Sequence, residues 1–151
     1  MSQILDKEEI KKFIPHREPF LFIDQLKDIK KLKCATGIKT FTLNDDFFKG
    51  HFPEQSVVPG VILVETMAQT AAALIAYSIK EETFDKIVYL MNIDNAKFRK
   101  PVFPNQTIFI KVNALRSKGR VWKFEGLIED NNLEIIAEAK WCATIMDKNK
   151  K

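Results

Sequence analysis

A short loop and the apolar segment after it hold the side chains best suited to chemistry. His51 lies between Gly50 and Phe52-Pro53, and Val58-Pro59-Gly60 leads from this loop into an apolar run that contains Glu65. A neutral imidazole can remove a proton, so His51 is a candidate general base. Apolar surroundings raise the pKa of a carboxyl group, so Glu65 is a candidate general acid. The alternatives are a structural histidine and a glutamate paired at a helix edge.

Four neighbouring residues could complete such a site by binding the substrate. Gly60 lets a ligand approach the free N–H groups of a helix start, which polarise a carbonyl oxygen. Gln69 lies one turn after Glu65 on the same helical face and could orient it. Phe52 directly follows His51 in the loop, and Pro59 is the last residue of the loop. Together these groups suit the removal of a proton next to a carbonyl with loss of a neighbouring hydroxyl. No serine or cysteine is placed to act as a nucleophile instead.

Length and composition indicate one ordinary globular domain. The 151 residues are 46% hydrophobic and 29% charged, which is enough for one core. We expect a single domain over 1–151, with 147–151 as a frayed tail. The first twelve residues carry six charges and no apolar signal sequence, so a cytoplasmic protein is expected. Cys34 and Cys142 lie far apart and predict neither a disulfide nor a metal site.

One long helix and several strands are predicted to position these residues. Residues 60–80 are apolar on nearly all faces, and Glu65 and Gln69 within them argue against a membrane span. Asp6 is predicted to cap a short helix over 6–13. Strands are predicted at 20–27, 31–41, 86–93, 96–102, 107–116, 120–129 and 133–146, with a loop at 44–59 and hairpin turns at 118–119 and 131–132. An antiparallel sheet around one helix is an α+β fold, and a helix apolar all round predicts a second subunit.

Basic residues are concentrated in one stretch of the chain. Residues 96–124 contain eight of them and no acid, so the rest of the chain carries a net charge of −4. This asymmetry favours an acidic partner for one face, and a solvated basic face without a partner is the alternative. No segment typical of nucleic-acid binding is present, so no nucleic-acid partner is expected.

Five blocks of sequence, in order along nearly the whole chain, resemble one known family. The blocks are Pro15-His16-Arg17-Glu18-Pro19-Phe20-Leu21, Gly50-His51-Phe52-Pro53, Val58-Pro59-Gly60-Val61, Glu65-Thr66-Met67-Ala68-Gln69 and Lys97-Phe98-Arg99-Lys100-Pro101-Val102-Phe103-Pro104. They resemble the FabZ-type (3R)-hydroxyacyl-[acyl-carrier-protein] dehydratases of bacterial fatty acid synthesis. Glu65 favours the plain dehydratases, because the related dehydratase-isomerases carry aspartate at this position.

The resemblance implies a hot-dog fold, with an antiparallel sheet around one central helix. It implies homodimers whose sheets join, commonly three in a hexamer, and a site in which His51 faces Glu65 of the neighbouring subunit. His51 would take the C2 proton, Glu65 would help the C3 hydroxyl leave, and the Gly60 amide would hold the thioester oxygen, with no cofactor or metal. The acyl chain would enter an apolar tunnel. The acidic acyl carrier protein would dock on basic residues, with Lys97, Arg99 and Lys100 as candidates.

Two other functions fit a hot-dog fold. A thioesterase would use Glu65 to activate water and would release a free thiol. A non-catalytic sensor of acyl thioesters would form no product and would not need His51 and Glu65 together. Assays of the product distinguish all three.

Overall fold

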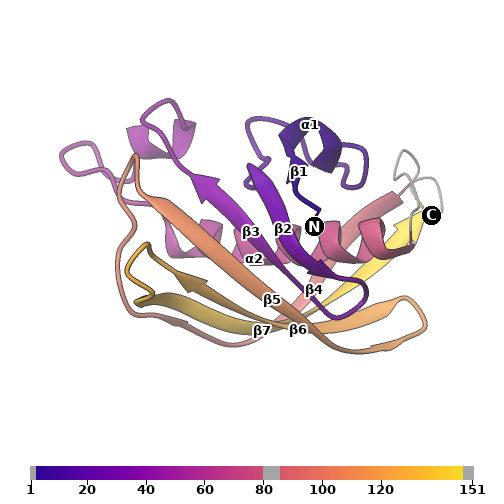
Figure 1. Cartoon of the computed structure of the whole chain (residues 1–151). Coiled ribbons are helices and arrows are strands. Elements are labelled where there is room, and N and C mark those ends of the chain that lie inside the picture. Colours follow the sequence, from indigo (N-terminus) through magenta and orange to yellow (C-terminus); the bar gives the residue numbers. More distant parts are fainter. Residues whose placement is uncertain (1–2, 80–85, 148–151) are drawn as a thin grey trace.

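One antiparallel sheet of seven strands wraps around one long helix (Figure 1). The computed structural model describes residues 3–79 and 86–147. The order of strands is β1-β2-β3-β5-β6-β7-β4, so β1 and β4 form the edges. This is the predicted α+β hot-dog architecture. The elements in chain order are β1 (Leu5–Asp6), α1 (Lys7–Ile10), β2 (Gln25–Lys30), β3 (Cys34–Thr40), the 3-10 helix η1 (Asp46–Lys49), α2 (Gly60–Ile79), β4 (Lys86–Phe98), β5 (Thr107–Lys118), β6 (Val121–Glu129) and β7 (Ile135–Asp147).

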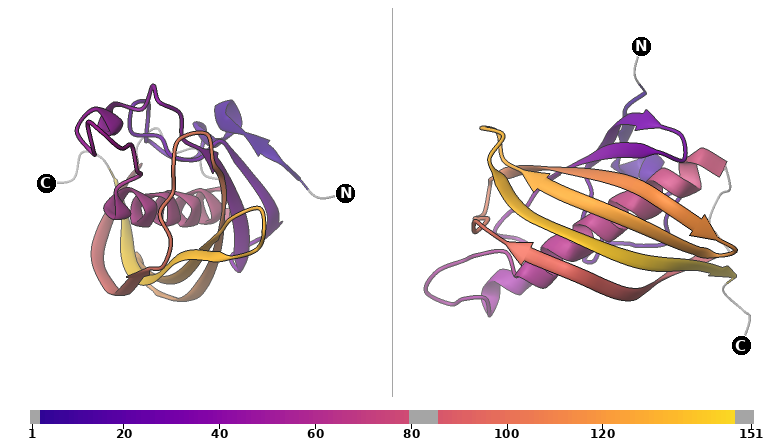
Figure 2. Two further views of the ribbon diagram at one scale, coloured as in Figure 1. Left: turned by 90° about the vertical axis from the view of Figure 1, so that its left-hand side faces the viewer. Right: turned by 90° about the horizontal axis from the view of Figure 1, so that it is seen from below.

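The helix α2 is the core of the molecule. It is long and apolar enough to cross a membrane, but the sheet curves around it and most of its length is buried (Figure 2). Leu63, Met67 and Leu74 are almost fully buried in one hydrophobic cluster with the inward side chains of the strands. Burying this apolar surface favours folding by about 25 cal/mol per Å². The apolar run is therefore a core helix.

Two glycines let α2 lie close to the sheet. A Cβ atom at Gly126 of β6 would come within 2.8 Å of the Met67 sulfur and 2.9 Å of the Trp141 ring. At Gly37 of β3, a Cβ would lie 2.6 Å from the Thr70 hydroxyl oxygen. These contacts fix the depth at which α2 lies in the curved sheet, and therefore the position of the residues at its N-terminal end.

Two predicted strands differ from the structure. Leu21, Phe22 and Ile23 are buried as expected, but the strand begins only at Gln25. The N–H group of Phe22 donates to the side chain of Gln69 (2.8 Å) instead of to a neighbouring strand, so this segment is tied to the helix. Residues 86–98 form one strand, β4, where two were predicted. Asn95 adopts a φ of 59° at an irregularity in the pairing with β7, so the strand bends there and continues.

The short N-terminal helix is capped as predicted but is shorter. The Asp6 side chain accepts from the Glu9 N–H group (2.8 Å), and the Glu9 side chain accepts from the Asp6 N–H group (3.2 Å), which is a complete capping box. The α-helix ends at Ile10, and turns continue to Phe13. Lys80, the predicted end of the long helix, and residues 148–151 of the predicted tail lie outside the described residues.

The edge strand β4 presents apolar side chains on both of its faces. Tyr89 is 52% exposed and Leu90 is 40% exposed. Both pair with β7 in regular register, and consecutive residues of a regular strand point to opposite sides. Met91 and Ile93 are exposed as well. A long edge strand with apolar side chains is normally covered by a partner. Among residues 3–79 and 86–147, none fully covers either face of β4.

Candidate active site

His51 is held by a clamped loop with one ring nitrogen available. Its Nδ1 atom lies 2.8 Å from the carbonyl oxygen of Val57, and the Val57 N–H group donates back to the His51 carbonyl (3.1 Å). A carbonyl oxygen only accepts, so Nδ1 carries the proton, and Nε2 of the neutral ring keeps its lone pair. The exposed Phe52 ring stacks on the imidazole with centroids 4.0 Å apart. The loop therefore presents Nε2 as a proton acceptor.

Glu65 is a largely buried carboxyl group in the second turn of α2. Its side chain is 22% exposed, and burial raises its pKa, while a hydrogen bond from Gln69 acts in the opposite direction. Gln69 Nε2 donates to Glu65 Oε2 at 2.9 Å, which is the contact predicted from their spacing. The raised pKa favours the protonated form, in agreement with the sequence-based expectation.

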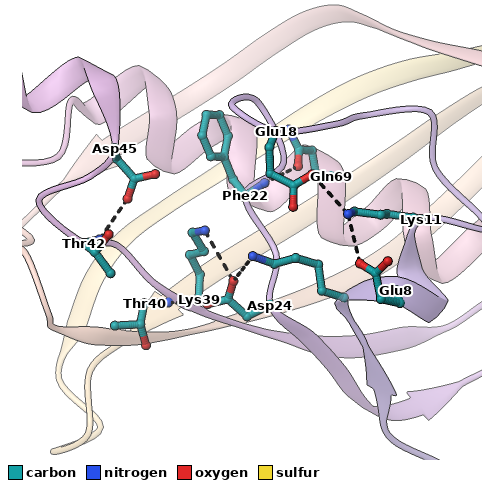
Figure 3. A network of polar contacts seen from close by, with 11 residues as sticks. Glu8, Lys11, Glu18, Phe22, Asp24, Lys39, Thr40, Thr42, Asp45 and Gln69 are labelled. Carbon is teal, nitrogen blue, oxygen red and sulfur yellow. Dashed lines mark hydrogen bonds and ion pairs between the residues drawn. The ribbon is translucent and has the colours of Figure 1, made fainter.

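Gln69 also fixes the segment that covers this part of the helix. It is 1% exposed, its Oε1 atom accepts from the Phe22 N–H group, and its Nε2 atom donates to the Phe20 carbonyl (3.0 Å). Figure 3 shows this side chain reaching from α2 to the backbone of Phe22. Because Oε1 must accept from the Phe22 N–H group and Nε2 must donate to the Phe20 carbonyl, it is the Nε2 end of the Gln69 amide that faces Glu65.

Replacing Gln69 by leucine is expected to lower the free energy of unfolding by about 2–4 kcal/mol, because two backbone groups and Glu65 lose their partner. Urea denaturation measures the change. Ser78→Ala is the matched control on the same helix, since Ser78 also bridges to a distant backbone N–H, that of Leu32 (2.9 Å), but is partly exposed. Equal losses in the two variants would contradict a special role of Gln69.

His16 approaches Glu65 from the N-terminal loop, a contact not anticipated from the sequence. Its Nε2 atom lies 3.7 Å from Glu65 Oε2, and its side chain is 16% exposed. The sequence signal for a functional role of His16 was its position between Pro15 and Pro19, next to an apolar run. His16 and Glu65 are far apart in the sequence, so their contact could not be predicted from spacing.

The start of α2 offers free backbone donors. The carbonyl of Pro59 accepts from Ile62 (2.9 Å) and Leu63 (3.3 Å), so the helix begins at Gly60. Among the described residues, the N–H groups of Gly60 and Val61 have no acceptor. A shallow pocket adjoins Gly60, and a Cβ there would come within 3.1 Å of the Phe98 ring. A carbonyl oxygen can therefore approach this helix end.

The structure does not bring His51 and Glu65 together within one chain. The polar contacts of Glu65 among the described residues are to Gln69 and His16, and that of the His51 ring is to Val57. Glu65 shares a half-open stripe of α2 with Val61 and Ala68, at helical spacing. This stripe is the part of α2 that the chain's own sheet leaves partly uncovered.

The basic residues of 96–124 do not form one surface, contrary to expectation. Lys97 lies near the C-terminal end of β4. Lys118 pairs with Val121, Val121 pairs with Thr144, and Thr144 pairs with Tyr89. Lys118 is therefore level with Tyr89, near the other end of β4. The β7 residues that pair with Tyr89 and Lys97 are Thr144 and Glu138, six residues apart, which corresponds to about 20 Å along the strand. The group around the hairpin turn comprises Arg116, Lys118, Arg120 and Lys123. Of the two groups, the one at 97–100 lies at the end of the sheet next to Gly60, since Arg99 and Lys100 line the same pocket as Gly60.

Two of the three predicted docking residues are already paired. Arg99 Nε contacts Glu138 Oε2 at 3.0 Å. Lys100 Nζ contacts Asp130 Oδ2 at 3.0 Å and also pairs with Glu134. Lys97 is exposed. An acidic partner would compete with the protein's own carboxylates at this end of the sheet.

Cys34 and Cys142 are both free thiols. Within residues 3–79 and 86–147, no three histidine, cysteine or acidic side chains gather in a group that could hold a metal ion.

Comparison with known proteins decides the family. A family model described as the FabA-like domain matches residues 14–140. The 3-hydroxyacyl-[acyl-carrier-protein] dehydratase FabZ of Paramagnetospirillum magneticum is 42% identical over 148 residues, covering 98% of this chain and 91% of the relative. The protein of the same name from Gluconobacter oxydans is 46% identical, covering 97% and 86%. The chain belongs to the FabZ-type dehydratases of the FabA-like family. It is a hydro-lyase, as the resemblance implied.

A solved structure supports the fold of this FabZ-type chain. The dehydratase heterocomplex ApeI:P from Xenorhabdus doucetiae contains a chain that matches with a TM-score of 0.77, covering 92% of this chain and 91% of that one. The sequence identity is 16%, so the likeness concerns the fold alone.

Proposed function

We propose that the protein removes water from (3R)-3-hydroxyacyl groups on acyl carrier protein and forms the trans-2-enoyl thioester. His51 takes the C2 proton on Nε2. Glu65 of the partner subunit gives its proton to the C3 hydroxyl, which leaves as water. Proton exchange with solvent then returns both groups to their starting state. No cofactor or metal takes part in these steps.

The environment of Glu65 carries this proposal. Burial favours its protonated form, and a protonated carboxyl group can donate to a leaving hydroxyl. A thioesterase would instead need the carboxylate to activate water. His51 complements the acid, since its Nδ1 atom is engaged by Val57 and Nε2 is left to accept a proton.

The start of α2 would bind the thioester. The free N–H group of Gly60 donates to the carbonyl oxygen as negative charge develops there. Pro59 and Phe52 line the approach, and the apolar acyl chain lies along the half-open stripe of α2. Lys97, Arg99 and Lys100 at this end of the sheet would meet the acidic carrier protein, with Arg99 and Lys100 exchanging partners. The hairpin group lies too far away to join them.

A second copy of the chain would complete the site. The apolar faces of β4 and the stripe of α2 that carries Val61, Glu65 and Ala68 are the surfaces that need covering. Pairing of two β4 edges joins the two sheets, and each subunit then offers Glu65 to His51 of the other. We infer a homodimer of this kind, with three dimers in a hexamer.

The protein's wider role follows from the same assignment. We infer that 1–151 is a single hot-dog domain that acts in the cytoplasm, in bacterial type II fatty acid synthesis. We infer no nucleic-acid partner and no membrane partner; against a membrane span, α2 is largely buried in the core.

The nature of the product tests the function. Purified protein with 3-hydroxyacyl-[acyl-carrier-protein] is expected to give the enoyl thioester, seen by mass spectrometry as loss of one water with the thioester intact. Release of a free thiol would indicate a thioesterase, and an unchanged substrate would indicate a sensor. Either result would overturn the proposal.

A further inference from the structure

His16 is a largely buried histidine that the proposed chemistry does not use. It lies in the loop between α1 and β2, and its Nε2 atom faces Glu65 Oε2 at 3.7 Å. Its other ring nitrogen, Nδ1, is buried and has no hydrogen-bond partner among the described residues. A buried ring with one nitrogen unpartnered and the other aimed at a carboxyl group calls for a physical account.

The unpartnered nitrogen indicates which tautomer is present. Burial and, to a smaller degree, the neighbouring Arg17 lower the pKa of His16 to about 4, so the ring is neutral near pH 7. A neutral ring carries one proton, on Nδ1 or on Nε2. A proton on Nδ1 would be a buried donor without an acceptor, which proteins rarely tolerate. The proton therefore resides on Nε2 and points toward Glu65.

We propose that His16 is a positioning residue for Glu65: its Nε2–H group and the Gln69 amide both address Oε2, so that Oε1 faces the substrate. The inference rests on the proposed function, in which Glu65 is the acid. The proposed role of His16 determines which oxygen of Glu65 donates the proton and which groups stabilise the negative charge that remains on Glu65.

Two donors on one oxygen determine where the acidic proton lies. Oε2 accepts from Gln69 Nε2 at 2.9 Å and faces His16 Nε2–H, so the proton of Glu65 belongs on Oε1. When Oε1 loses this proton, negative charge spreads over both oxygens, and the donors on Oε2 stabilise it. The 3.7 Å separation is longer than a hydrogen bond, and such contacts tighten as charge develops.

The charged groups around the pair are few. Arg17 is the charged side chain next to His16, and its guanidinium donates to the carbonyls of Lys11, Ile14 and His16. In the proposed dimer, His51 of the partner subunit is the further titratable group near Glu65. The pKa of His16 is lowered to about 4, whereas the pKa of Glu65 is raised above its ordinary value. His16 is therefore a neutral donor at the pH at which Glu65 loses its proton.

The tautomer can be measured directly in the wild-type protein. The chain contains only two histidines, His16 and His51, so ¹⁵N spectra of the imidazole rings are simple to assign. We expect the Nε2–H form for His16 and the Nδ1–H form for His51. In Glu65→Gln, the His16 Nε2 signal is expected to shift. The Nδ1–H form at His16 would overturn the proposal, and this test needs no variant of His16.

Activity provides the second test. His16→Phe keeps the ring and removes the donor, so kcat is expected to fall about three- to tenfold with KM nearly unchanged. The alkaline limb of the pH profile of kcat is expected to move to higher pH, because the Glu65 carboxylate loses a donor. His16→Gln keeps an N–H group at a similar reach and is expected to recover most of both properties.

The control and the contrary results separate this inference from the proposed function. Glu18→Gln alters an exposed carboxylate of the same loop that pairs with Lys11, and it is expected to leave kcat and its pH profile unchanged. A His16→Phe enzyme with wild-type kcat and pH profile, together with an inactive Glu65→Gln enzyme, would remove only the positioning role. Wild-type turnover by Glu65→Gln would overturn the proposed function itself.

Discussion

Replacing Glu65 by glutamine is expected to lower kcat for dehydration by about 10²- to 10⁴-fold, the range for loss of a general acid. Glutamine has the same shape, and its carbonyl oxygen can accept the hydrogen bond that Gln69 Nε2 now gives to Oε2. The fold should therefore persist while the acidic proton is lost. His51→Ala is expected to lower kcat by a similar factor, because it removes the base. Steady-state assays of enoyl thioester formation measure both effects.

Glu54→Gln is the matched control for these variants. It makes the same chemical change on an exposed side chain in the loop that follows His51, and we expect unchanged kcat. Circular dichroism and gel filtration check that each variant keeps its fold and assembly. Near wild-type turnover by either Glu65→Gln or His51→Ala would remove that residue from the mechanism.

The expected pH dependence follows from the acid role of Glu65. Burial raises its pKa, and the acid acts only while protonated, so kcat should fall as pH rises through that pKa. This alkaline limb should be absent from the residual activity of Glu65→Gln.

The sequence allowed the helix and its carboxyl group to be predicted well. A continuous apolar run after Val58-Pro59 predicted a helix from Gly60, and α2 begins there and continues to Ile79, the last described residue before 86. The four-residue spacing of Glu65 and Gln69 gave their hydrogen bond, because helix geometry is regular. The break expected within β4 was wrong, since Asn95 adopts a left-handed conformation that bends a strand without ending it.

Contacts made by backbone atoms and by irregular loops could not be predicted. The partner of His51 is the Val57 carbonyl, and every residue has a carbonyl, so no residue type marks it. His16 reaches Glu65 from a loop whose later residues, Phe20 and Phe22, are tied to the helix by Gln69. Likewise, the density of basic residues along the chain suggested one basic face. The strands instead place residues 97–100 and the group around the hairpin turn at opposite ends of the sheet.

Mixing the two inactive variants is expected to restore activity. If His51 acts with Glu65 of the partner subunit, a dimer of one His51→Ala chain and one Glu65→Gln chain contains one site with both changes and one intact site. Co-expression in equal amounts makes half of the dimers mixed, so about a quarter of wild-type activity is expected, far above either variant alone. Two observations on the single chain lead to this expectation. Glu65 does not contact His51 of its own chain, and the half-open stripe of α2 that carries Glu65 is free to meet a partner subunit.

The control for this experiment is a mixture of His51→Ala with the double variant His51→Ala, Glu65→Gln. Its mixed dimers contain no His51, so they should stay inactive however the chains pair. A mixture of the single variants that remains as inactive as its components, with mixed dimers shown by native mass spectrometry, would place base and acid in the same chain. Recovery instead requires each subunit to supply half of every site, which makes the uncovered faces of β4 and α2 part of the catalytic machinery.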